Sequence, residues 1–317
     1  MEGTLVPPTG AQLHLFPMAP PTSIKNALVL ILATLRCLPL VANGRFSAAF
    51  ATGGYVSIPA SIAVRLMRVP LVVFLPDVVP GKAVKLLVPL ARRIAVSTDD
   101  ARRYLPPEKV TVTGYPVRDS FLEATREEGR KRLELPDDAR VLCVLGGSQG
   151  ARAINEALAA HLPTLLNSFF VIHICGEQRF PEAQAVADTL SPGQRKQYRL
   201  YPYMHDPEIA YALAAADLAV CRSGASVLGE LPAVGTPAIL VPLPIPGVHQ
   251  RENAEYLAQR GAAVILEDQA LTERLGYTVH ELLSNDSRLR TMEMASRSLA
   301  RPDAAAAMAR VLEETLR

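Results

Sequence analysis

The chain of 317 residues contains no tryptophan, and only 5% of its residues are aromatic. Net charge is also scarce, because 33 Lys and Arg stand against 31 Asp and Glu and leave a formal charge of +2. A chain this close to neutral lacks the strong positive charge of most nucleic-acid-binding proteins, so we expect no nucleic acid among its partners. Its 49% of hydrophobic residues is enough to build a core, which excludes a disordered polymer.

Cysteines are few and widely spaced, without the pairs typical of a zinc site: Cys37, Cys143, Cys175 and Cys221. This usage predicts free structural thiols in a reducing compartment. The first ten residues are polar and proline-rich, unlike a secretory signal. The longest apolar stretch, residues 27–42, is interrupted by Arg36 and Pro39, and we expect it to be too short to cross a bilayer but able to lie on one.

The small net charge conceals an asymmetry along the chain. Residues 1–120 contain 13 Lys and Arg and 6 Asp and Glu, which leaves 20 and 25 for the remainder. A basic first third beside an acidic remainder indicates that the first part meets anions, such as phosphates or an anionic lipid surface. Ordinary solvated charge is the simpler alternative.

Short apolar runs alternate with helical patterns along most of the chain, which is typical of parallel βαβ units. We predict an α/β protein with two doubly wound parallel-sheet domains, since ten strands are too many for one ordinary domain. A charged helix over 120–133 and a turn at 135–138 place the boundary near residue 134. The predicted domains cover residues 1–134 and 135–300, and a helix over 301–317 is expected to return to the first. The strands are predicted at residues 46–52, 69–75, 93–97, 110–114, 140–146, 169–175, 199–203, 218–222, 237–242 and 263–266.

The first candidate site is a glycine-rich turn between a buried strand and a helix, which reads Gly146, Gly147, Ser148, Gln149 and Gly150. The glycines allow the backbone to approach a ligand, and the amides that open the helix carry partial positive charge toward an anion. The turn lacks the lysine of a Walker loop and the spacing of a dinucleotide fingerprint. A tight turn without a ligand is an equally good interpretation of this motif alone.

A second strand-to-helix turn contains Arg222, Ser223, Gly224 and Ala225, and Glu230 follows within two helical turns. A carboxylate at that place can accept hydrogen bonds from both hydroxyls of a ribose while the helix start faces phosphate. The alternative, that Glu230 only favours the helix dipole, has equal weight.

Further polar residues stand at expected strand ends. His249, Gln250 and Asn253 open a helix after a proline-rich loop, and amides three residues apart suit sugar hydroxyls. In the basic domain, the turn at Gly53, Gly54 and Tyr55 and the arginine Arg118 both follow strands, where ligands of open α/β sheets bind. There is no Asp-x-Asp or His-Glu-x-x-His, so we expect no metal or other cofactor, and a leaving phosphate stabilised by helix dipoles and arginine.

In this order, these motifs closely resemble those of the MurG family, the UDP-N-acetylglucosamine:N-acetylmuramyl-(pentapeptide) pyrophosphoryl-undecaprenol N-acetylglucosamine transferases. The resemblance covers nearly the whole chain. It implies a two-domain inverting glycosyltransferase of the GT-B type, peripheral to the cytoplasmic side of the cell membrane. By this resemblance Glu230 would hold the uridine ribose, Ser148 and the loop at 146–150 the donor diphosphate, and Gln250 and Asn253 the sugar hydroxyls, with Arg118 near the phosphates.

Two departures from the family pattern stand out. The segment at residues 1–7 resembles one that lies later in family members, so the first domain is expected to lack a strand and glycine-loop unit together with a histidine suspected of catalytic work. The family's His-Glu-Gln-Asn is here Phe74-Leu75-Pro76-Asp77. Asp77 is a candidate base for the acceptor hydroxyl, although a helix-capping role is the simpler alternative.

The leading hypothesis is transfer of N-acetylglucosamine from UDP-N-acetylglucosamine to the muramyl 4-hydroxyl of lipid I, which gives lipid II for peptidoglycan. The expected partners are the nucleotide sugar, the undecaprenyl-diphosphate-linked acceptor and an anionic membrane surface. A catalytically silent nucleotide-sugar-binding protein, or a truncated fragment of the enzyme, is the main alternative, motivated by the absent glycine loop. A UDP-N-acetylglucosamine 2-epimerase on the same fold is a third, but it would leave the basic half without a purpose.

Overall fold

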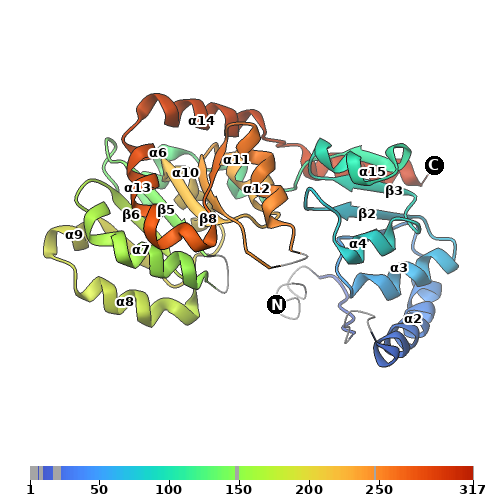
Figure 1. The fold of residues 1–317 in the computed structure, drawn as a ribbon. Coiled ribbons are helices and arrows are strands. Elements are labelled where there is room, and N and C mark those ends of the chain that lie inside the picture. Colours follow the sequence, from blue (N-terminus) through green and yellow to red (C-terminus); the bar gives the residue numbers. More distant parts are fainter. Residues whose placement is uncertain (1–5, 7–9, 17–22, 147–149, 246–247, 317) are drawn as a thin grey trace.

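The computed structural model describes residue 6 and residues 10–16, 23–146, 150–245 and 248–316. The chain forms two α/β domains side by side, each built on a parallel sheet (Figure 1). A strand is present at each of the ten predicted positions. The predicted class, two parallel-sheet domains, is therefore confirmed.

The first sheet has four parallel strands in the order β1-β2-β3-β4. Its strands are apolar on both faces, as expected for a parallel sheet covered by helices. Leu71, Val73 and Leu75 of β2 point to one core, whereas Phe74 points to the opposite face. The strand bounds are β1 (Ala49–Ala51), β2 (Leu71–Leu75), β3 (Arg93–Val96) and β4 (Val110–Val112).

Helices cover both faces of this sheet. The first core is closed by α2 (Ile24–Gly44), α3 (Ser57–Leu66) and α4 (Lys82–Leu87). On the other face lies α15 (Ala304–Thr315), which contacts β2 and β3 and buries Met308 against Phe74 and Ala95. The C-terminal helix thus returns from the second domain to the first, as Figure 1 shows in red.

Helix α2 extends beyond both ends of the apolar run at residues 27–42. Ser23 caps its start by accepting a hydrogen bond from the Asn26 amide at 3.2 Å, and the helix continues to Gly44. The segment Lys25–Gly44 is long and apolar enough to cross a membrane by length and composition alone, contrary to the expectation from residues 27–42. In the structure one face of α2 is buried against α3 and the sheet through Cys37 and Val41.

The second sheet has six parallel strands in the order β10-β9-β8-β5-β6-β7. The chain runs outward from β5 to β7 and then crosses to β8 on the other side of β5. The strand order therefore reverses between β5 and β8, the place where open α/β sheets form a crevice. The bounds are β5 (Val141–Leu145), β6 (Phe170–Ile174), β7 (Tyr198–Tyr201), β8 (Leu218–Arg222), β9 (Ala238–Val241) and β10 (Ala263–Ile265).

Two cores flank the second sheet. One face packs against α7 (Arg152–Leu165) and α13 (Leu271–Leu283), and the other against α10 (Glu208–Ala215), α11 (Val227–Val234) and α12 (Gln250–Gln259). The remaining helices are α5 (Asp119–Glu123), α6 (Arg126–Arg132), α8 (Phe180–Asp188), α9 (Pro192–Lys196) and α14 (Asp286–Ser298), with short 3-10 turns at Asp99–Tyr104, Pro107–Lys109, Glu177–Arg179 and Asp268–Ala270.

The predicted helix over 120–133 is two helices in the structure. Thr125 interrupts it, because its hydroxyl accepts a hydrogen bond from the Glu128 amide at 3.2 Å and starts α6 anew. Both helices pack on α10, and α5 also packs on α11, so Phe121 and Leu133 belong to the core of the second domain. By packing, the chain thus enters the second domain close to Arg118, before the boundary predicted near residue 134.

Candidate active site

A cavity of about 680 Å³ opens where the strand order of the second sheet reverses. It lies at the carboxyl ends of β5 and β8, beside the starts of α7, α11 and α12, so three helix N-termini border one space. Cavities at this place of an open α/β sheet bind anionic ligands, because free backbone amides face them. Its lining residues are Leu145, Gly146, Gly150, Ala151, Arg152, Ala153, Glu156, Leu213, Cys221, Arg222, Gly224, Ser226, Val227, Glu230, Leu231, Leu243 and Gln250.

The turn from β5 to α7 has room only for glycine at its two described ends. A Cβ at Gly146 would clash with the backbone nitrogen of Ala151, and one at Gly150 would lie 2.5 Å from the Cys175 carbonyl oxygen. Gly150 also has a φ of 74°, in the left-handed region. Gly147, Ser148 and Gln149, predicted as phosphate ligands, lie outside the described residues.

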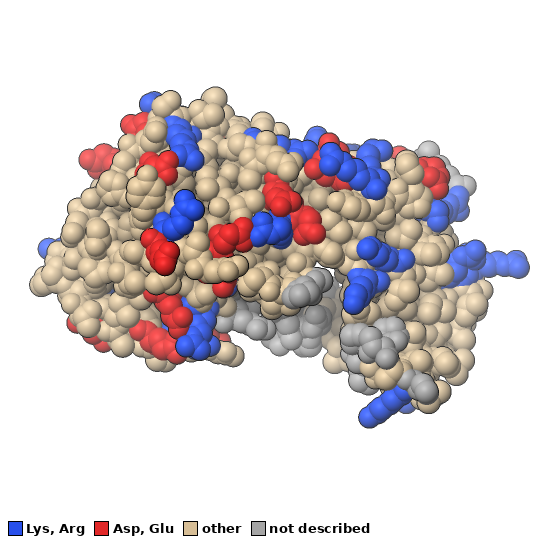
Figure 2. All heavy atoms as spheres, viewed as in Figure 1, with Lys and Arg blue, Asp and Glu red and all other residues tan. Residues whose placement is uncertain are grey.

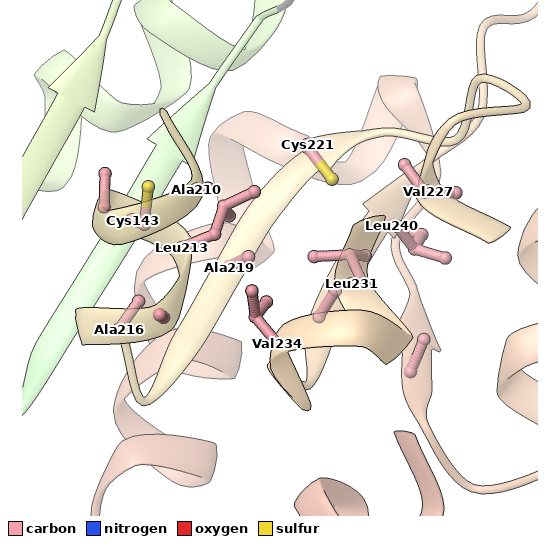
Figure 3. Close-up of a cluster of buried hydrophobic side chains, with 14 of the residues drawn as sticks. Cys143, Ala210, Leu213, Ala216, Ala219, Cys221, Val227, Leu231, Val234 and Leu240 are labelled. Atoms are coloured by element: carbon pink, nitrogen blue, oxygen red, sulfur yellow. The ribbon is translucent and has the colours of Figure 1, made fainter. Parts of the chain in front are cut away.

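The floor of the cavity is apolar. Leu213, Cys221, Val227 and Leu231 belong both to the lining and to the buried cluster drawn in Figure 3. Burial, together with the charge of Glu230, raises the pKa of the Cys221 thiol to about 12, so the thiol stays protonated and is not a nucleophile. A flat apolar ligand group fits this floor, and charged groups fit the rim.

Glu230 stands on α11 at the rim, where 25% of its side chain is exposed. Burial raises the pKa of this carboxyl, although a hydrogen bond from Ser226 and the charge of Arg118 act in the opposite direction. Arg118 Nη2 lies 3.4 Å from Glu230 Oε1, and Arg118 Nε lies 3.4 Å from Asp206 Oδ1. The structure thus brings the predicted phosphate and ribose residues together as a partly exposed ion pair, in which Arg118 is the more exposed partner.

The Arg222–Ala225 segment divides between the cavity and the protein interior. Arg222 and Gly224 line the cavity, whereas Ser223 is fully buried and Ala225 lies beside Gly224 before α11. Arg222 pairs with Asp268 and donates to the Val241 carbonyl oxygen at 3.4 Å. Its Nε and the Ser223 hydroxyl find no hydrogen-bond partner in the described part of the chain.

The three polar residues at the start of α12 face different surroundings. Gln250 lines the cavity, with its Oε1 accepting a hydrogen bond from the Leu243 amide at 3.1 Å. His249 precedes the helix and lies 3.4 Å from a carboxylate oxygen of Glu252. Asn253 is fully buried and does not line the cavity; it hydrogen-bonds to Asp77 and Val78 of the first domain and to the Ser223 carbonyl oxygen of the second.

Asp77 follows β2 and is half-buried between the domains. It does not cap a helix, because α4 begins five residues later with Gly81 as its cap, so that expectation is wrong. Its Oδ1 accepts a hydrogen bond from Asn253 Nδ2 at 2.8 Å. Burial raises the pKa of the Asp77 carboxyl, while the Asn253 hydrogen bond and the charge of His249 oppose this shift.

Tyr115 is a residue of this region that the sequence interpretation missed. The ring lies tilted against Phe74 with centroids 6.1 Å apart, and its backbone meets α11 so closely that a Cβ at Gly229 would lie 2.9 Å from the Tyr115 carbonyl oxygen. Burial raises the pKa of its phenol, and the charges of Glu230 and Asp77 add to that shift. Its position after β4, between Gly114 and Arg118, was the available signal.

The glycine turn of the first domain does not join the cavity. Gly53, Gly54 and Tyr55 follow β1 and lead into α3, and none of them lines the large cavity of the second domain.

The sequence interpretation also missed Arg152 and Glu156 of α7, which line that cavity and pair with each other. Among the residues that the structure describes, no three His, Cys, Asp or Glu side chains gather as a metal site.

Comparisons with known proteins agree with this geometry. Residues 141–308 match the model of the Glycosyltransferase family 28 C-terminal domain. Proteins named UDP-N-acetylglucosamine--N-acetylmuramyl-(pentapeptide) pyrophosphoryl-undecaprenol N-acetylglucosamine transferase are similar over nearly the whole chain. The protein from Roseiflexus sp. (strain RS-1) is 42% identical over 99% of this chain and 81% of its own length, and the one from Desulforudis audaxviator is 34% identical over 99% and 87%.

Solved structures lead to the same fold. The crystal structure of Acinetobacter baumannii MurG has a TM-score of 0.78 and 25% identity, covering 99% of this chain and 88% of that one. A UDP-GlcNAc 2-epimerase from Neisseria meningitidis has a TM-score of 0.68 at 14% identity over 94% and 84%, which indicates a common fold only. By its match to the family model, its identity to curated relatives and its fold, the chain belongs to the MurG family of glycosyltransferases.

Proposed function

We propose that this protein transfers N-acetylglucosamine from UDP-N-acetylglucosamine to the muramyl 4-hydroxyl of lipid I, forming lipid II. The observation that carries the proposal is the cavity at the reversal of the second sheet, with Glu230 on its rim and the start of α7 at its edge. The names of the family's curated members supply the two substrates.

The donor fits the cavity part by part. The uracil lies on the apolar floor, and the Glu230 carboxylate accepts hydrogen bonds from the ribose hydroxyls. The diphosphate faces the amides at the start of α7, and the sugar hydroxyls reach Gln250. Glu230 must release Arg118 to receive the ribose, and the freed guanidinium then lies beside the phosphates as a charge-assisted donor.

The chemistry exchanges one bond at the anomeric carbon. The bond from this carbon to the diphosphate breaks, a bond to the acceptor oxygen forms on the opposite face, and the hydroxyl proton passes to a base. Charge accumulates on the departing UDP, so donors already oriented by the helix starts and Arg118 stabilise it without reorganisation.

Turnover of UDP-N-acetylglucosamine with a short-chain lipid I analogue, followed by mass spectrometry, tests the proposal. Glu230→Ala should raise the KM for the donor roughly a hundredfold, because hydrogen bonds to a charged group contribute about 1.5–3 kcal/mol each. The matched control is Glu273→Ala, which removes an exposed carboxylate from α13. Wild-type protein that neither binds the donor nor yields product would overturn the proposal.

Two other outcomes separate the alternatives. A silent binding protein would bind UDP-N-acetylglucosamine without forming product from any acceptor. An epimerase would convert the donor alone into its 2-epimer, with no acceptor present. Each assay uses the same protein and donor, so one set of reactions decides among the three functions.

We further propose that the first domain rests on the anionic cytoplasmic face of the cell membrane. Several large apolar side chains on α2 are exposed, and they form a stripe along the face turned away from the core: Leu28, Ile31, Leu32 and Leu35. Leu66 and Met67, at the end of the neighbouring helix α3, are exposed as well. An apolar helix face bordered by basic residues is the pattern of an interfacial membrane helix.

The basic residues of this domain support the same proposal. A pocket of about 340 Å³ at the amino ends of β2, β3 and β4 is lined by Arg65, Arg68, Arg92 and Lys109 without any acidic residue. Figure 2 shows blue side chains on the first domain, at the right, many of them apart from red ones. Anionic headgroups attract such cations, and a diphosphate-linked lipid acceptor would approach from the same surface.

A further inference from the structure

A second cavity of the second domain, with a volume of about 290 Å³, lies between α7 and α8 beside β6 and β7. In Figure 1 these elements are at the left, on the side of the domain away from the first domain. A cavity of about 150 Å³ can hold one benzene ring, so this cavity has the volume for a fused bicyclic group. Its apolar wall consists of Leu158, Ala159 and Leu162 of α7 and Ala183 and Val186 of α8.

The inner end of this second cavity is polar but uncharged. Asn155 Nδ2 donates to the Cys175 carbonyl oxygen at 2.8 Å, so Asn155 Oδ1 accepts from His173 Nε2 at 3.1 Å. Burial lowers the pKa of His173 to about 4, and the neutral ring accepts at Nδ1 from the Tyr198 hydroxyl at 2.7 Å. Within the described part of the chain, the Tyr198 phenol oxygen accepts no hydrogen bond and one Asn155 amide hydrogen is unused. This end is matched to one neutral hydrogen-bonding group, because a charge buried here would have no counter-charge.

The outer end of the second cavity carries charges that balance one another. Arg152 pairs with Glu156 at 2.6 Å, and Arg179 pairs with Glu182 at 3.1 Å. All four side chains line the cavity. Two cations and two anions favour no net charge on a ligand, so the outer end also suits a neutral molecule.

The second cavity is joined to the donor cavity by shared atoms. Arg152 and Glu156 line both cavities. The Cys175 carbonyl oxygen, which accepts from Asn155, also touches the glycine turn, since a Cβ at Gly150 would lie 2.5 Å from it. A ligand that moves Asn155 therefore changes the contacts of the turn that leads into α7. This chain of contacts is a physical route by which one cavity can affect the other.

We propose that the second cavity binds a neutral small molecule with an apolar body the size of a fused ring pair and one hydrogen-bonding group, and that this site is coupled to the donor cavity through α7 and the glycine turn. The binding itself does not depend on the proposed function, whereas the coupling rests on a donor nucleotide in the first cavity. By linkage, each ligand must change the affinity of the other by the same factor.

The test of binding uses 2-naphthol, a fused bicyclic ring with one hydroxyl. Its fluorescence is followed in titrations of the full chain, which has no tryptophan emission of its own. Wild type should bind it at one site with a Kd at or below about 1 mM. Ala183→Leu extends the apolar wall of α8 into the cavity and should weaken binding at least tenfold, whereas Ala185→Leu, at an exposed position of the same helix, should bind like wild type. Ala159→Leu and the exposed control Ala160→Leu give the same comparison on α7 should Ala183→Leu fail to fold.

The test of coupling measures UDP binding by calorimetry at rising concentrations of 2-naphthol. Two coupled sites should change the Kd for UDP at least fivefold and then bring it to a plateau. Saturating UDP should change the Kd for 2-naphthol by the same factor. Ala185→Leu should keep this effect, and Ala183→Leu should shift it to at least tenfold higher 2-naphthol concentrations.

The two halves of the proposal fail in different ways. Wild type that binds no 2-naphthol, or cavity-filling variants that bind it as well as wild type, would refute the second site. A Kd for UDP that rises without limit would place the probe in the donor cavity and refute the site as well. A Kd for UDP that does not change would refute the coupling. Wild type that binds 2-naphthol but no UDP would refute the proposed reaction and the coupling, and would leave the second site standing.

Discussion

The two domains share one architecture, a parallel sheet between helices, but they differ in how many of their basic residues form ion pairs within the domain. In the described part of the first domain, Arg103 alone of the basic residues pairs with an acid of its own domain, Asp100 at 3.8 Å. The others form no ion pair there: Lys25, Arg36, Arg45, Arg65, Arg68, Lys82, Lys85, Arg92, Arg93, Arg102 and Lys109. In the second domain most arginines have an acidic partner, as in the pairs Arg132–Glu128, Arg222–Asp268 and Arg288–Glu281.

The contrast has a physical consequence for binding. Cations with no acidic partner are not neutralised within the protein, and they raise the positive potential over the surface of the domain. Paired cations are neutralised locally, and two of them, Arg152 and Arg222, line the cavity of the second domain. This contrast fits the proposal that the first domain meets an extended anionic surface and that the second binds one ligand in one orientation.

The largest effect is expected where the second domain buries its charges. Asp217 is 3% exposed and is paired with Arg126, Arg130 and Arg140, while its Oδ2 also accepts from the Val141 amide at 2.8 Å. Asp217→Ala leaves the buried guanidinium of Arg130 without its carboxylate partner. Removing one partner of a buried ion pair lowers the free energy of unfolding by about 3–5 kcal/mol. Hydrogen exchange of the amides in β5 and β8 measures this loss within the second domain.

Comparison variants bring out the difference between the domains. Arg92→Gln in the first domain removes an unpaired cation and should change the free energy of unfolding by less than about 0.5 kcal/mol, as should Asp138→Ala on the surface. Equal losses in Asp217→Ala and Arg92→Gln would contradict the view that only the second domain relies on internal charge pairs.

A smaller, pH-dependent loss is expected from a buried histidine of the second domain. His173 lies between the Tyr198 hydroxyl, 2.7 Å from Nδ1, and Asn155 Oδ1, 3.1 Å from Nε2. Burial lowers its pKa from 6.5 to about 4. Between these values the unfolded chain binds more protons than the folded one, so stability falls as the pH falls, by about 3 kcal/mol at pH 4.

Unfolding of the second domain, followed at pH 7, 6, 5 and 4, measures this effect. His173→Gln removes the titrating group and should flatten the dependence on pH in this window, whatever it costs at pH 7. His205→Gln, at an exposed position, should keep the wild-type slope. An unaltered slope in His173→Gln would show that other groups cause the acid sensitivity.

The strands were predictable because of the way a parallel sheet is buried. Runs such as Val141–Leu145 and Ala238–Val241 are apolar at successive positions, since both faces of each strand are covered. The break at Thr125 was not predictable in the same way. A threonine is tolerated within a helix, and here its capping bond and the packing of two short helices on α10 decide the outcome.

The sequence identifies several residues of the site, but it does not predict which groups each of them contacts. Gln250 and Asn253 are three residues apart, which places them about 60° apart around the helix, and this angle is enough to turn one toward the cavity and the other toward the first domain. The sequence could not predict that Asp77 contacts Asn253, because the two residues meet only when the two domains pack together. Arg118 was expected at phosphates, and in the structure it pairs with Glu230, a contact between distant segments that the sequence does not predict.

The smallest single effect is expected for the unpaired cations of the first domain, one residue at a time. Each basic residue near an anionic membrane contributes about 1 kcal/mol, so Arg92→Gln should weaken binding to vesicles rich in phosphatidylglycerol about fivefold. Arg288→Gln, which removes a paired cation from the second domain, should leave vesicle binding unchanged. Cosedimentation at low and high salt measures both, and the difference should fade at high salt because exposed charges are screened. Equal losses for Arg92→Gln and Arg288→Gln would mean that binding follows total charge, and the contrast between the domains would then have no part in it.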